Sequence, residues 1–178
     1  MIISILIMSL FGRCSNENVD IVELMADKYV EICTSKGISI IDSLHKHENY
    51  LVNSGLFEDT SSATVYGIWQ RLAEESDGGV LLNYSFSKEF QMELRTNGVI
   101  EEYENWLREE VINEDFYYQS DLYLIEQKVD SMKFLPDINV GMIGSIVTSI
   151  LDTSDFDSKY YRLVSYGVIP LGCGNARK

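Results

Sequence analysis

The sequence is short of prolines, histidines and basic residues, and each shortage argues against a class of structure or function. Only 2 of the 178 residues are proline, so long stretches can form uninterrupted helix. The 14 lysines and arginines face 28 aspartates and glutamates, which gives a net charge of -14. This charge repels nucleic acid and disfavours docking to anionic lipid. It favours solubility and suits a basic protein as partner.

Catalytic and metal-binding motifs are also missing. The sequence contains no Gly-x-Ser-x-Gly motif, no Gly-x-x-x-x-Gly-Lys phosphate loop and no Cys-x-x-Cys pair. On a helix, His45 and Glu48 are neighbours, whereas His47 points about 200° away from His45, so the three cannot share one metal. We expect a solvated polar face here, and a protein that is not an enzyme and holds no metal or cofactor. The alternative is an enzyme that uses scattered carboxylates, or His45 with Glu48.

The first residues differ in character from the rest of the chain. Residues 1–11 read MIISILIMSLF and are apolar apart from two serines. A helix of this length reaches about 16 Å, roughly half the thickness of a bilayer core, so we do not expect it to span a membrane. The apolar run stops at Gly12-Arg13-Cys14, and polar residues follow.

An apolar run that stops at a cysteine resembles a bacterial lipoprotein signal peptide. The pattern departs from that family at Phe11, at Arg13 and in the lack of basic residues after Met1. The resemblance implies that residues 1–13 are a signal or anchor segment and that Cys14 is lipidated. It also implies export to the cell envelope, either to the periplasm or to the membrane through this segment alone. A signal peptide cleaved without lipidation, or a buried N-terminal helix, is the alternative.

Lipidation of Cys14 would leave Cys33 and Cys173 as the remaining cysteines of the chain. In an oxidising compartment these two can form a disulfide. Such a bridge would close a loop of about 140 residues and contribute about 4–5 kcal/mol to stability. The alternative is two unrelated thiols, of which Cys33 lies in an apolar helical stripe where a thiol is inert.

Apolar residues recur at steps of three and four along residues 14–178, which predicts a single acidic, all-α domain. We expect a compact bundle of about seven helices. The predicted helices cover 19–35, 38–53, a segment from the capping residues 59–62 to the glycines at 78–79, 87–98, 99–112, 115–134, 138–151, and a last helix that ends at Gly167.

Three segments carry more specific predictions. Residues 80–86 read VLLNYSF and fit either a short strand or the start of a helix. Residues 138–151 are apolar on most sides, so we expect the central buried helix there, with Gly141 and Gly144 allowing a neighbour to approach closely. Residues 154–157 fit a capping box for the last helix. One inward stripe is expected along 115–134, formed by Tyr118, Leu122, Ile125, Val129 and Met132.

Residues 101–115 read EEYENWLREEVINED, with seven acids against one base, Arg108. Like charges at i, i+4 destabilise a helix by a few tenths of a kcal/mol each. Carboxylates beside rigid aromatics suit a surface that binds a basic partner, because charge raises the association rate and aromatics act as anchors. The predicted partner-binding residues, called here the acid-aromatic cluster, are Glu101, Glu102, Tyr103, Trp106, Glu109, Glu110, Glu114, Asp115 and Tyr118.

These features predict a non-enzymatic, exported or membrane-tethered helical protein that binds a protein partner. Its most specific form is an inhibitor or immunity-type protein that blocks a basic enzyme. The alternatives are a structural envelope lipoprotein without an inhibitory role, and, for the cluster itself, a solvated helix face with Trp106 in the core.

Overall fold

A computed structural model describes residues 20–75, 79–132 and 139–171. Within these residues the chain forms ten α-helices, one 3-10 turn (η1) and no strand, so the predicted all-α fold is confirmed. The elements are α1 (Ile21–Ser35), α2 (Ile40–Asn53), α3 (Ser62–Glu75), α4 (Gly79–Tyr84), α5 (Lys88–Thr96), α6 (Val99–Glu110), α7 (Asp115–Tyr118), α8 (Asp121–Met132), α9 (Val140–Ile150), η1 (Thr153–Asp157) and α10 (Lys159–Ser165). No helix in the described ranges is both long and apolar enough to cross a membrane.

Local sequence signals explain where most helices begin and which side they bury. Asp20 caps α1, and its side chain accepts hydrogen bonds from two backbone N–H groups of the first turn. Ser87 caps α5 in the same way, as its sequence position predicts. The apolar residues of α3 recur at steps of three and four and form its buried side, which consists of Val65, Ile68, Trp69 and Leu72.

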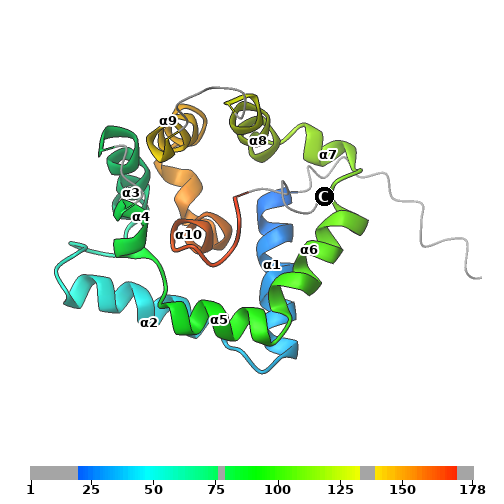
Figure 1. Ribbon diagram of the computed structural model, residues 1–178, viewed down its shortest axis with the longest axis horizontal. Coiled ribbons are helices and arrows are strands. Elements are labelled where there is room, and N and C mark those ends of the chain that lie inside the picture. The colour runs from blue at the N-terminus through cyan, green and yellow to red at the C-terminus, as the bar shows by residue number, and fades with distance from the viewer. Residues whose placement is uncertain (1–19, 76–78, 133–138, 172–178) are drawn as a thin grey trace, which may run out of the picture.

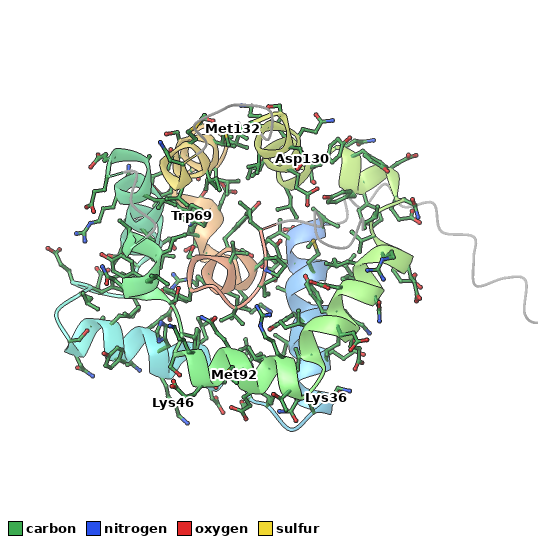
Figure 2. The ribbon with its side chains drawn as sticks, in the orientation of Figure 1. Lys36, Lys46, Trp69, Met92, Asp130 and Met132 are labelled. Atoms are coloured by element: carbon green, nitrogen blue, oxygen red, sulfur yellow. The ribbon has the colours of Figure 1, made fainter. Side chains whose placement is uncertain are left out.

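The centre of the molecule is α10, which the other helices surround (Figure 1). Five of its seven residues are buried. In Figure 2 the Trp69 side chain of α3 points towards this centre, whereas Lys36 and Lys46 lie on the outer rim. The indole Nε1 of Trp69 donates a hydrogen bond to the Ser165 hydroxyl at 2.8 Å, which joins α3 to α10.

The prediction that residues 138–151 form the central buried helix is wrong. In α9 only Gly141, Gly144 and Val147 are buried, and its isoleucines are half-buried. The predicted close approach at Gly144 is present, since a Cβ added there would lie 2.7 Å from the Ala73 backbone nitrogen and 2.9 Å from the Trp69 carbonyl oxygen. The lack of a side chain at Gly144 therefore allows α9 to pack closely against α3 at the periphery of the molecule.

The single helix predicted over 115–134 is also wrong, because α7 and α8 are separate. Ser120 interrupts the segment: its hydroxyl accepts a hydrogen bond from the Tyr123 N–H at 3.2 Å and donates to the Tyr117 carbonyl at 2.7 Å. The break moves the buried position from Tyr118 to Tyr117, which is fully buried, whereas Tyr118 is 45% exposed.

Two smaller predictions are corrected as well. The strand alternative for residues 80–86 is wrong, because α4 occupies this segment. The capping box near residue 154 belongs to η1, where Asp152 and Asp155 exchange side-chain and backbone hydrogen bonds. The last helix, α10, is capped instead by Ser158, whose side chain accepts a hydrogen bond from the Tyr160 N–H.

Candidate functional site

An open cavity of about 940 Å³ lies where the start of α1 meets α7, α8, η1 and the start of α10. Figure 1 shows α7 and α8 on the same side of the molecule as the first turn of α1. Six carboxylates line it, and among the described residues that line it there is no lysine, arginine or histidine. We call it the acidic cavity; its carboxylates are Asp20, Glu23, Asp115, Asp121, Asp155 and Asp157.

The carboxylates gather here because several helices begin at this place. Asp20 precedes α1, and its Oδ1 atom accepts the N–H groups of Val22 and Glu23 at 3.0 and 3.3 Å. Asp115 and Asp121 are the first residues of α7 and α8. The free N–H groups and the dipole at a helix start stabilise negative charge, so each helix tolerates its own acid. Packing then places these separate starts around one space.

Repulsion between these acids is visible at Asp155. Burial raises the pKa of its carboxyl above the ordinary value, and the charges of Asp152 and Asp121 raise it further. A hydrogen bond that its Oδ2 accepts from the Asp152 N–H, at 2.7 Å, works in the opposite direction. Asp121 belongs to α8 and Asp155 to η1, so the two sides of the cavity interact electrostatically.

Tyr161 of α10 lines the same cavity and is only 4% exposed. Its ring packs against Phe156 and Tyr160, with ring centroids 5.7 and 5.4 Å away. Its hydroxyl forms no hydrogen bond with any residue in the described ranges, although the charges of Asp155, Asp121 and Asp20 act on it. Burial, followed by these charges, raises the pKa of Tyr161, so the phenol stays protonated at neutral pH.

One base lies near the cavity without lining it. The Nζ atom of Lys159 is 2.8 Å from the Asp27 carboxylate and 3.7 Å from that of Glu23. Glu23 is therefore partly neutralised, while the other lining carboxylates have no ion pair within the described part of the chain. No group of three or more metal-ligating side chains that could hold an ion is present among the described residues.

The acid-aromatic cluster predicted from the sequence divides in the structure. Glu101 and Glu102 lie at the start of α6, roughly 12 Å from Glu109 and Glu110 at its end. The Glu102 carboxylate forms an ion pair with Lys36 of α1 at 2.7 Å, so the start of α6 is partly neutralised. At the other end, Glu109, Glu110 and Glu114 are exposed and lead along the chain to Asp115 at the cavity.

The aromatic members of the cluster do not lie together on the surface. Tyr103 is fully buried, and its ring packs edge-to-face on Tyr29 at 5.0 Å, so its assignment to the binding surface is wrong. It follows Val99 by four residues and precedes Leu107 by four, which places all three on the inward side of α6. Trp106 is half-buried and stacks on Tyr103, whereas Tyr118 is exposed and its ring meets that of Tyr123 edge-to-face at 5.0 Å.

The solvated polar face predicted for His45, His47 and Glu48 is wrong for two of the three residues. His45 is exposed, but Glu48 is only 5% exposed. His47 stacks on Phe86 at 4.2 Å, and its Nε2 atom lies 2.8 Å from the Tyr84 carbonyl oxygen. Burial lowers the pKa of His47 below its ordinary value.

Glu48 belongs to a buried network that ties α2 to α10. A guanidinium nitrogen of Arg162 is 2.6 Å from the Glu48 carboxylate, and the Tyr166 hydroxyl donates to the same oxygen at 3.1 Å. Arg162 also donates to the carbonyls of Phe156 and Thr60 at 2.8 and 3.0 Å. The network is closed by protein groups, so we assign it to stability. Sequence reasoning missed it, although the spacing of Glu48 between Leu44 and Leu51 placed it on the inward side of α2.

Two of the three cysteines, Cys14 and Cys173, lie outside the described residues, so lipidation and the Cys33–Cys173 bridge remain predictions. Cys33 is fully buried in α1. Burial raises the pKa of its thiol to about 12, which keeps it protonated and unreactive in the native protein.

The acidic cavity is thus an open polar site, whereas the Glu48 network is closed by protein groups. Of the residues predicted to bind a partner, Asp115 lines the cavity, and the exposed residues Glu109, Glu110 and Glu114 precede it in the chain. Comparison with protein-family models, with curated proteins and with solved structures gives no match for this chain.

Proposed function

We propose that this protein is a non-enzymatic binding protein that captures a basic protein partner at the acidic cavity and at the glutamates beside it. The observation that carries the proposal is a cavity lined by six carboxylates and by no base among its described residues. Glu109, Glu110 and Glu114 are exposed and precede the lining residue Asp115 in the chain, which adds negative charge to this part of the protein. A concave surface of one sign of charge focuses the field and speeds association with a partner of opposite sign.

The positions of these carboxylates support recognition by a preformed site. Asp20 and Asp155 accept backbone hydrogen bonds, and Asp157 accepts one from the Ser62 hydroxyl. Side chains held in this way lose little conformational entropy when a cation binds, which raises the affinity. The pKa of Asp155 is raised by burial and, after that, by the charges of Asp152 and Asp121. A bound cation relieves this repulsion, which favours binding further.

The most specific form of the proposal is an inhibitor or immunity-type protein that blocks a basic enzyme in the cell envelope. Export through residues 1–13 and anchoring at Cys14 belong to the same proposal. Asp20 follows Cys14 by six positions, and a fully extended chain of that length spans at most about 20 Å. Anchoring at Cys14 would therefore hold the cavity close to the membrane surface, where its partner would have to pass.

A charge-reversal experiment tests the proposal. Glu109 and Glu110 are the last two residues of α6, and Glu74 and Glu75 are the last two of α3. Both pairs are exposed and occupy equivalent positions in their helices. The two double substitutions therefore change the net charge and the interaction with the helix dipole by the same amount. We expect Glu109→Lys/Glu110→Lys to reduce capture of basic envelope proteins at least tenfold, and Glu74→Lys/Glu75→Lys to leave capture unchanged.

Capture is measured by pull-down from an envelope extract at two salt concentrations, with circular dichroism to confirm that both variants keep their helices. Equal loss in the two variants would indicate non-specific charge attraction and contradict the proposal. Unchanged capture in both, together with release of Cys14→Ala from the membrane fraction, would favour a structural envelope lipoprotein instead.

A further inference from the structure

We propose that the acidic cavity is an arginine pocket, in which the guanidinium group of an arginine-bearing segment contacts the carboxylates and the hydroxyl of Tyr161. This inference rests on the proposed function, because it names the group of the basic partner that enters the site. It commits to arginine rather than to positive charge in general, and three features of the described residues support that choice.

The first feature is Tyr161 itself. Tyr161 as a whole is only 4% exposed and lines the cavity, and its hydroxyl has no hydrogen-bond partner among the described residues. Its burial and the charges of three carboxylates disfavour ionisation of the phenol, so it stays neutral. A ligand that donates hydrogen bonds supplies the missing partner, because the phenol oxygen is an acceptor.

The second feature is the distribution of the carboxylates around the cavity. Asp20 belongs to the start of α1, Asp121 to the start of α8 and Asp155 to η1, so the acceptors approach the space from different elements. Guanidinium has five N–H donors in a rigid planar fork, and it meets several acceptors at once, often in bidentate pairs. An ammonium group has three donors on a flexible stem and acts as a point charge.

The third feature is the apolar part of the lining. Phe116 and Tyr161 contribute aromatic rings to the same cavity as the carboxylates. Arginine stacks on aromatic faces, where the electrostatic attraction of the ring adds to the hydrogen bonds. The volume of about 940 Å³ is at the upper end of the range for ligand sites, so it admits a side chain together with the residues that flank it.

The test measures the binding of short peptides to the full-length protein by isothermal titration calorimetry. Three probes have the same length: acetyl-Gly-Arg-Arg-Gly-amide, the same peptide with two lysines, and the same peptide with two citrullines. Lysine keeps the charge without the fork, and citrulline keeps the shape without the charge. We expect the arginine peptide to bind roughly tenfold more tightly than the lysine peptide, and the citrulline peptide not to bind.

Two tyrosine variants place the binding in the cavity. Tyr161→Phe removes one hydroxyl and keeps the packed ring, so we expect it to weaken arginine-peptide binding several-fold while lysine-peptide binding stays the same. Tyr50→Phe removes the hydroxyl of an exposed tyrosine in α2, outside the cavity lining, and is the matched control, with no expected change. Should Tyr161→Phe fail to fold, Asp121→Asn provides the second variant, and it should weaken both cationic peptides.

The outcomes separate this inference from the function on which it rests. Equal binding of the arginine and lysine peptides, or unchanged selectivity in Tyr161→Phe, overturns the arginine pocket. Charge-dependent capture of a basic protein in the pull-down would then still support the proposed function. Absence of binding by every peptide, together with unchanged capture in both charge-reversal variants, overturns both.

Discussion

Removing either member of the buried Glu48–Arg162 pair should destabilise the protein, and the two losses should be unequal. The side chains are 7% and 14% exposed, so solvent screens their attraction little. Glu48→Gln keeps an acceptor for Arg162 and removes only the charge. Arg162→Met leaves Glu48 as a buried charge with only the Tyr166 hydroxyl, and it deprives the carbonyls of Phe156 and Thr60 of a donor.

The expected magnitudes follow from these lost contacts. Glu48→Gln weakens the charge-assisted hydrogen bonds from Arg162 and Tyr166 but keeps an acceptor for them, so we expect a loss of about 1.5–3 kcal/mol. Arg162→Met breaks a buried ion pair and leaves the carbonyl of the buried residue Phe156 without its donor, so we expect about 3–5 kcal/mol. The second figure is a large part of the roughly 5–15 kcal/mol by which single domains are stable.

Urea unfolding followed by circular dichroism at neutral pH measures both free energies. The double variant Glu48→Gln/Arg162→Met provides the control, because it leaves no unpaired buried charge and should cost less than the sum of the two single changes. Equal losses in the single variants, or strict additivity in the double variant, would show that the network adds nothing beyond its separate side chains and would refute this reasoning.

Three further predictions test other features of the fold. Gly144→Ala should cost about 1–3 kcal/mol, because its Cβ would lie 2.7 Å from the α3 backbone, whereas Gly67→Ala, with nothing within 4 Å, should gain up to about 1 kcal/mol in urea unfolding. Hydrogen bonds from neighbouring hydroxyls lower the pKa of Asp59 from 3.8 to about 2, so the stability that wild type has over Asp59→Asn should be present above pH 4 and should vanish as pH falls to about 2. The Cys33 thiol, with its pKa raised to about 12, should react with iodoacetamide only after unfolding; no reaction in urea until a reductant is added would instead show that it is bridged to Cys173.

Local periodicity predicted the helices well where one face is clearly apolar. The four inward residues of α3 and the Ser87 cap of α5 follow from spacing and side-chain chemistry within a few residues. The same reasoning failed at Ser120, because a serine inside a periodic stretch gives no local sign of whether it interrupts the helix. It also failed at α9, where apolar residues on most sides indicate burial but do not say which helix lies at the centre.

The acidic cavity shows the same division between local and long-range information. A chain with 28 acids has to place most of them at its surface, and the acids that precede helices are visible in the sequence as capping residues. Their convergence is not visible, because Asp20, Asp121 and Asp155 belong to elements far apart in the chain. The position of Tyr161 in the cavity lining depends on the same packing. Nothing beside it in the sequence distinguishes it from the neighbouring Tyr160, which does not line the cavity.

The sequence by itself determined the helical class, the strong negative charge, most helix starts and the inward stripes. Each of these depends on residues within one or two turns of one another or on composition alone. Only the tertiary structure decided that several helix starts surround one cavity, that Tyr161 lines it, and that Glu48 meets Arg162 across 114 residues of sequence. Such contacts depend on how helices pack, because shape and volume across the whole core, rather than local pattern, select the neighbours.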